Sequence, residues 1–148
     1  MELQYRENSL SAEDFIRLRV EVGRVCIPLP QAEAALRRGL YNVTAFYGEK
    51  AVGMGRLVGD GAMYWYIQDM AVLPEFQRQG IGKHIVEMLL FHAYEHTPSG
   101  CFSTVGLMAA KGKEGFYEKL GFKGRPDNGC GAGMMCYVEK PQAEGEQA

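Results

Sequence analysis

The feature that most constrains the fold is a glycine-containing loop between a predicted buried strand and a predicted amphipathic helix. Residues 63–73 are rich in aromatic and β-branched side chains and stop at Pro74, a pattern typical of a buried strand. Apolar residues then recur at helical spacing: Ile81, Ile85, Leu89 and Ala93. Residues 101–108 read as another strand, so the order predicts a βαβ crossover with the loop at its first turn.

The loop from Gln77 to Lys83 is a candidate anion site. A helix start presents N–H groups without intrahelical partners and the positive end of the helix dipole. Gly80 and Gly82 would let a phosphate approach the backbone closely, and Arg78 adds positive charge beside Lys83. From these residues alone, a tight turn that needs glycine only for its backbone angles is the alternative.

Two motifs in the chain resemble the GNAT superfamily of acyl-coenzyme-A-dependent N-acetyltransferases. Gln77, Gly80 and Gly82 match every fixed position of the family's pyrophosphate-binding signature, Q/R-x-x-G-x-G/A, and residues 115–122 match its late FYEKLGF signature. The resemblance runs from about Tyr41 to Phe122. Residues 52–61 and 67–69 are also similar to the arylalkylamine, or serotonin-type, branch. The resemblance implies an α/β (α+β) fold with a mixed, mostly antiparallel sheet of about six to seven strands and about four helices.

The resemblance also implies acetyl-coenzyme A as co-substrate and a set of residues that bind it. They come from the strand before the loop, the loop itself and the late motif: Met70, Ala71, Val72, Gln77, Arg78, Gln79, Gly80, Ile81, Gly82, Lys83 and Tyr117. Family spacing directs the Met70 N–H at the thioester carbonyl, where it would stabilise an oxyanion, and pairs Val72 with the pantetheine amide.

Direct acetyl transfer needs a neutral amine, a polarised carbonyl and a proton for the departing thiolate. The resemblance gives the last task to Tyr117, the tyrosine of the late motif. Asp69 is the acidic residue nearest the expected reaction centre, where it would bind a cationic amine or accept its proton through water. Gln68 stands where many relatives carry glutamate and cannot act as a base, so Asp69, Tyr66 and solvent stay open as the proton acceptor.

A second departure from the family pattern is Ala110, where many relatives carry an asparagine that contacts pantetheine. Lys111 or Lys113 would compensate by reaching the phosphates, or would be solvated charges at a helix end. Phe15, Arg19 and Val22 of the predicted first helix are candidates for the opposite wall of the acceptor site.

Length and composition set the frame for these motifs. The chain has 148 residues, which fits one domain over about residues 1–140, and the tail 141–148 has no large apolar residue and is expected to be disordered. A formal charge of −2 gives no general field for nucleic acid or an anionic membrane. The start of the chain lacks the apolar core of a signal peptide, so we expect a cytoplasmic protein.

The cysteines and histidines do not indicate a metal site. Cys26, Cys101, Cys130 and Cys136 lack C-x-x-C spacing, so reduced thiols are expected. His92 and His96 share a helix face but do not form the zinc-protease motif, and we assign no metal. A monomer and a homodimer are both compatible with the sequence.

The remaining segments predict a small α/β domain. Strands are expected near residues 3–6, 42–47, 51–58, 122 and 134–139, and helices near 12–22, 30–38, 80–96 and 112–120, the first capped by Ser11. We interpret the chain as an acyltransferase that acetylates a primary amine, more consistent with a small molecule than with a protein or peptide. A non-catalytic acyl-coenzyme A sensor is the alternative from another class, because Gln68 and Ala110 depart from the family.

Overall fold

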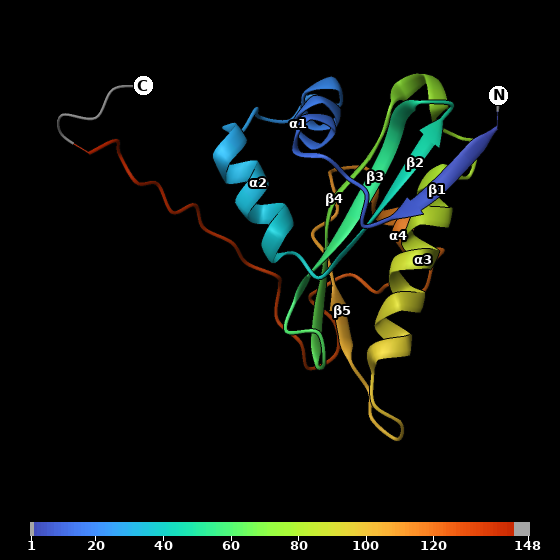
Figure 1. The fold of residues 1–148 in the computed structure, drawn as a ribbon. Coiled ribbons are helices and arrows are strands. Elements are labelled where there is room, and N and C mark those ends of the chain that lie inside the picture. The colour runs from blue at the N-terminus through green and yellow to red at the C-terminus, as the bar shows by residue number, and fades with distance from the viewer. Residues whose placement is uncertain (1, 144–148) are drawn as a thin grey trace. The chain divides into compact units, whose positions relative to one another are not determined.

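The computed structural model describes residues 2–143, which divide after Met108 into two compact units (Figure 1). The first unit contains one mixed sheet with helices on both of its faces. The second contains one short helix. The positions of the two units relative to each other are not determined, so each is described by itself.

The sheet of the first unit has the strand order β1-β2-β3-β4-β5. Its strands are β1 (Leu3–Glu7), β2 (Tyr41–Tyr47), β3 (Lys50–Gly59), β4 (Tyr64–Val72) and β5 (Thr104–Gly106). The first four pair antiparallel, and β5 pairs parallel to β4. Asp60 closes the β3–β4 turn because one of its carboxylate oxygens accepts the N–H groups of residues 62, 63 and 64. These bonds lower the pKa of Asp60.

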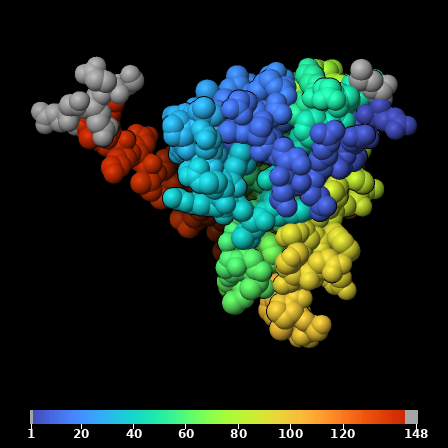
Figure 2. Space-filling view, viewed as in Figure 1, coloured from blue at the N-terminus to red at the C-terminus, as the bar shows by residue number. Residues whose placement is uncertain are grey.

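Helices α1 (Ala12–Glu21) and α2 (Leu29–Arg38) lie on one face of the sheet, and α3 (Ile81–His96) lies on the other (Figure 1). Ser11 caps α1, as predicted, by accepting the Asp14 N–H at 3.1 Å. Figure 2 shows α1 and α2, coloured blue to cyan, side by side at the surface. A short 3₁₀ turn, η1 (Pro74–Phe76), connects β4 to the loop before α3.

Apolar residues are buried on both faces of the sheet, under α3 on one face and under α1 and α2 on the other. Helix α3 buries the four apolar residues predicted from the helical spacing, and Val86 in addition: Ile81, Ile85, Val86, Leu89 and Ala93. Burial of each large aliphatic side chain contributes about 2 kcal/mol. None of the helices in the described residues is both long and apolar enough to cross a bilayer. Because α3 is packed through these buried residues, its first turn is held near the end of β4.

The second unit differs from the sequence prediction. It contains α4 (Glu114–Glu118), which Gly121 ends with a φ of 98°. The predicted strands at Phe122 and at residues 134–139 do not form, so the described residues hold five strands rather than six to seven. Residues 134–139 are extended without a ladder partner, and Met134 is 87 % exposed. Strand propensity gives no strand without a partner. Of the tail predicted over residues 141–148, residues 144–148 lie outside the described residues.

Candidate functional site

One edge of β4 is open over half of the strand. On its β5 side, β4 pairs only through Tyr64–Tyr66, and no described strand pairs there with residues 67–72. The Leu73 N–H donates in the opposite direction, to the Val52 carbonyl on β3 at 2.9 Å. Because successive backbone groups of a regular strand alternate in direction, Val72 directs its own to the open side. One residue predicted to bind the cofactor thus faces an edge that a ligand can pair with.

A β-bulge distorts β4 directly before this edge. Met54 pairs with Ala71, whereas Arg56 pairs with Gln68, so Asp69 and Met70 together oppose Gly55. Asp69 has a φ of 56°, in the left-handed region. With regular alternation its carboxylate would follow Ile67 into the apolar core under α3. The bulge instead turns it to the α1 face and Met70 to the α3 face.

Gly55 makes room for this bulge. A Cβ built on Gly55 would lie 2.4 Å from the Met70 Sδ and 2.8 Å from a methyl carbon of Ile85 on α3. Both distances are shorter than van der Waals contact allows. The Met70 side chain therefore occupies the space that a side chain at position 55 would fill.

Asp69 lies at the centre of an ion cluster with three arginines. Arg19 of α1 donates to one carboxylate oxygen, Arg56 of β3 donates to the other at 2.8 Å, and Arg24 has a nitrogen 4.0 Å from the first oxygen. The Asp69 side chain is only 8 % exposed. Both oxygens of this predicted base are therefore already paired with cations.

The arginines also tie the helices to the sheet. Arg56 donates to the Ala35 carbonyl of α2 at 3.3 Å, and Arg24, which follows α1, donates to the Met70 carbonyl. Phe15 is 1 % exposed and lies beneath the guanidinium groups of Arg19 and Arg56, 5.9 and 5.3 Å from its ring centre. Phe15 is thus a core residue rather than an exposed pocket wall.

The first turn of α3 has the features expected of an anion site. Gly80 is its N-cap with a φ of 83°, and no side chain caps the helix. The first intrahelical bond runs from the His84 N–H to the Gly80 carbonyl, so the N–H groups of Ile81, Gly82 and Lys83 precede the helical ladder. Arg78 and Lys83 are exposed beside them.

Gln77, a fixed position of the motif, binds the protein itself. Its side-chain nitrogen donates to the Val72 carbonyl at 2.9 Å, which ties the loop to the last residue of β4. Gln79 makes a similar contact with the Glu75 carbonyl at 3.4 Å. These bonds tie both glutamine side chains to the backbone of the chain itself.

Tyr117 belongs to the second unit. It lies on α4, is half-buried, and its ring contacts Phe116 and Phe122 edge-on with centroids 5.0 and 5.9 Å away. Ala110, Lys111 and Lys113 lie just before α4, where the Lys113 N–H donates to the Ala110 carbonyl. Both lysines are exposed.

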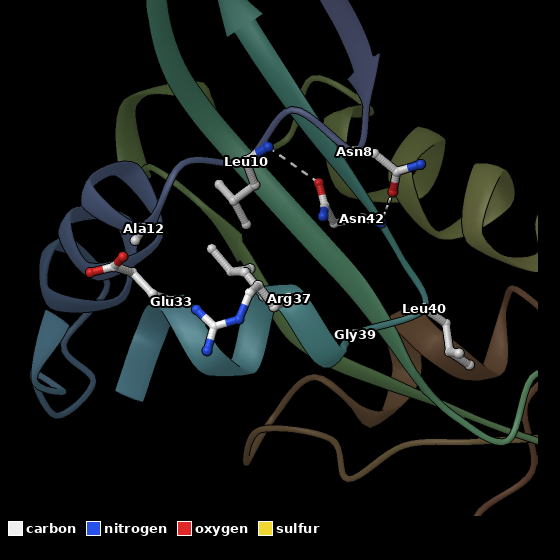
Figure 3. A pocket seen from close by; sticks show the side chains of 9 residues that line it. Asn8, Leu10, Ala12, Glu33, Arg37, Gly39, Leu40 and Asn42 are labelled. Carbon is white, nitrogen blue, oxygen red and sulfur yellow. Dashed lines mark hydrogen bonds between the residues drawn. The ribbon is translucent and has the colours of Figure 1, made fainter. Parts of the chain in front are cut away.

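A groove of about 590 Å³ opens on the α2 side of the first unit (Figure 3). It lies between α2, the start of β2 and the segment before α1, where the Asn42 side chain accepts the Leu10 N–H at 3.3 Å. Glu33 and Arg37 are its charged lining residues. One charge of each sign gives the groove no electrostatic preference.

The histidines of α3 pack rather than converge on an ion. His92 stacks on Tyr41 and on His96, with centroid distances of 3.9 and 4.1 Å. Burial and the neighbouring His96 lower the pKa of His92. No group of three or more potential metal ligands converges anywhere in residues 2–143.

Comparison with known proteins identifies the family. The model of the acetyltransferase (GNAT) domain matches residues 39–124, which is more than half of the chain. The chain belongs to the GNAT acetyltransferase family. Its fold is thus that of a GNAT domain, as the resemblance predicted.

Relatives and solved structures agree with this assignment. An uncharacterized N-acetyltransferase, ycf52, of Pyropia yezoensis is 30 % identical over 110 residues, which are 72 % of this chain and 61 % of that protein. A GNAT acetyltransferase from Streptococcus pneumoniae is 30 % identical with a TM-score of 0.78, and a probable acetyltransferase from meticillin-resistant Staphylococcus aureus is 27 % identical with a TM-score of 0.82. Each structural match covers 94 % of this chain and 100 % of the other. The chain spans 61 to 65 % of the length of its first two curated relatives.

The sequence analysis assigned no role to two arginines that contact Asp69, Arg24 and Arg56. Arg56 left a signal, because it is a charged residue within an otherwise apolar strand, and such a residue needs a buried partner. Arg24 left none, since it lies in an irregular segment between two helices.

Proposed function

We propose that this GNAT chain transfers the acetyl group of acetyl-coenzyme A to a primary amine of a small molecule by direct attack. One observation carries the proposal: the open edge of β4 leads through a tied loop to the uncapped start of α3. An extended ligand with amides at one end and a diphosphate at the other fits this arrangement. Acetyl-coenzyme A, the co-substrate of GNAT acetyltransferases, has this chemistry.

The backbone binds the donor in this proposal. The Val72 N–H pairs with a pantetheine amide, and the Met70 N–H donates to the thioester oxygen as negative charge develops on it. Residues 80–83 bind the diphosphate through their N–H groups, with the charges of Arg78 and Lys83 nearby. Ala71 lies between the two binding residues and keeps their spacing.

In the proposed transfer step, the acetyl group passes directly from sulfur to nitrogen. The neutral amine nitrogen forms a bond to the carbonyl carbon, the carbon–sulfur bond breaks, and the thiolate takes a proton. We assign that proton to the Tyr117 phenol, by the position of this tyrosine in the late motif. The amine nitrogen loses its own proton.

Solvent is the proposed acceptor of the amine proton. Gln68 cannot accept it, and burial raises the pKa of Tyr66, so that phenol keeps its own proton near neutral pH. Both oxygens of Asp69 accept bonds from arginines. We therefore propose that Asp69 acts as a positioning residue, which holds the bulge that directs the Met70 N–H.

A small acceptor is favoured over a basic peptide. The groove beside α2 carries one acidic and one basic residue, so it does not provide the acidic surface that would attract a lysine-rich segment. We propose the cytoplasm as the compartment, because Cys26, Cys101, Cys130 and Cys136 are all exposed free thiols, which suit a reducing environment.

A paired measurement tests the proposal. Acetyl-coenzyme A should raise the unfolding temperature and should release free thiol when an amine panel is added. S-acetyl-N-acetylcysteamine, which has the thioester but no diphosphate, should stabilise far less at equal concentration. Stabilisation without thiol release from any amine would indicate an acyl-coenzyme A sensor, and equal stabilisation by both thioesters would exclude the diphosphate site at α3.

A further inference from the structure

We propose that the acceptor carries an anionic group next to its amine, and that Arg24 binds this group. This proposal rests on the proposed function and names the substrate class for the same site. Three guanidinium groups face one carboxylate in the cluster, which leaves a formal charge of about plus two on the α1 face of the bulge.

No further acid balances this charge. Among the ion pairs of the described residues, Arg19, Arg24 and Arg56 share Asp69 as their acidic partner and have no second one. The Nε–H of Arg19 is buried and donates to no protein acceptor in the described residues. The cluster is also poorly hydrated, since the side chains of Arg19 and Arg56 are 19 % and 13 % exposed. Partly buried, uncompensated cations favour an anion from outside the chain.

Arg24 is the member that a ligand can reach. Its side chain is 34 % exposed, whereas Asp69 is 8 % exposed. Arg24 donates to the carbonyl of Met70. Met70 is also the residue whose N–H we propose to bind the thioester oxygen. An amine that attacks the thioester carbon must therefore pass within reach of this guanidinium, and a carboxylate or phosphate a few bonds from the amine can bind it in a bidentate pair.

The same charges assist the chemistry. Cations near an ammonium group lower its pKa, so a larger fraction of the acceptor is in the neutral, nucleophilic form. The effect replaces part of the work of a general base, which Gln68 cannot perform. A polyamine, in contrast, would bring further positive charge to a site that is already cationic.

Matched acceptor pairs test the inference by free thiol release with saturating acetyl-coenzyme A. Phenylalanine with phenylalaninamide tests a carboxylate, phosphoethanolamine with ethanolamine tests a phosphate, and spermidine represents the polyamines. In at least one pair, we expect the member that carries an anionic group to have a kcat/KM about tenfold or more higher than the member that lacks one. The pair that responds identifies the anion. Equal or better turnover of the members without an anionic group, or a preference for spermidine, would overturn the inference. Either result would leave the proposed acetyltransferase activity standing.

Arg24→Gln should remove the preference mainly through KM, and Arg24→Lys should keep part of it because the charge remains. Arg38→Gln, which removes an exposed arginine of α2, is the matched control and should keep the wild-type ratio. Unfolding temperature with acetyl-coenzyme A verifies that each variant is folded and binds the donor. A folded Arg24→Gln variant with the wild-type ratio would show that Arg24 is only a tether. Absence of turnover from every acceptor would refute the proposed function itself.

Discussion

Gly55→Ala is the sharpest test of how the site is built. The added Cβ would lie 2.4 Å from the Met70 Sδ, 2.8 Å from Ile85 Cγ2 and 3.2 Å from Leu89 Cδ1. Met70 is flexible, but Ile85 is β-branched and fully buried on α3, so it cannot move away without strain. Overpacking of this kind costs about 1–3 kcal/mol, and two contacts below 3 Å favour the upper half of that range.

Urea unfolding measures this cost. We expect the midpoint to fall with an unchanged m-value, and the unfolding temperature to fall by roughly 4–10 °C for a chain of this size. Because Met70 must move, kcat should fall more than the affinity for acetyl-coenzyme A. Gly106→Ala is the control: its Cβ would meet Tyr66 at an ordinary 3.6 Å, so we expect nearly wild-type stability.

A double variant separates the two clashes. Met70→Ala combined with Gly55→Ala should be more stable than the sum of the single effects predicts, because the contact at the sulfur disappears while the one at Ile85 remains. Strict additivity, or a Gly55→Ala variant as stable as Gly106→Ala, would refute the account in which the Met70 side chain fills the space at Gly55.

Three further predictions concern Asp69, the loop and the α3 histidines. Asp69→Asn leaves partly buried arginines without their carboxylate and should lower the free energy of unfolding, measured with urea, by about 3 kcal/mol. Asp14→Asn, in a half-exposed pair, should cost under about 1 kcal/mol. Equal costs would contradict the buried cluster. Gly80→Ala and Gly100→Ala both place alanine at φ near 80° with nothing within 4 Å, so each should lose about 1 kcal/mol of stability. In a binding titration, only Gly80→Ala should weaken the affinity for acetyl-coenzyme A, by about tenfold. Equal affinities of the two variants would exclude the loop as a binding site. Burial holds the pKa of His92 below its usual 6.5, so the folded chain binds fewer protons than the unfolded chain and loses stability as pH falls below about 6.5. His92→Gln should reduce this loss of stability between about pH 7.5 and 5.5. Substitution of the exposed His84 by Gln should not reduce it.

Local signals predicted the parts of the fold that depend on short-range rules. Ser11 caps α1 because its hydroxyl accepts the Asp14 N–H, and Gly121 ends α4 at a positive φ that favours glycine. The βαβ crossover followed from the order of a buried strand, a glycine loop and a helix that buries one face. Each of these depends on residues close in sequence.

Features that depend on distant partners were not predictable. The bulge at Asp69 interrupts the two-residue period of β4, and Met70 fits there beside Gly55, a residue of another strand that has no side chain. The pairing of both Asp69 oxygens requires Arg19 and Arg56, which are 50 and 13 positions away. The predicted strand at residues 134–139 was wrong for the same reason, since alternation gives no information on whether a partner exists.

The arginine cluster has a consequence for how this chain can change. Arg56 fastens α2 through the Ala35 carbonyl, Arg24 fastens the segment after α1 to β4, and Arg19 holds the Val25 carbonyl at 3.3 Å. The side chains that we propose set the charge of the acceptor site are thus the same ones that hold α2 and the segment after α1. If that proposal holds, a substitution that alters acceptor preference also loosens the fold, and a shift to cationic acceptors requires a compensating anchor first.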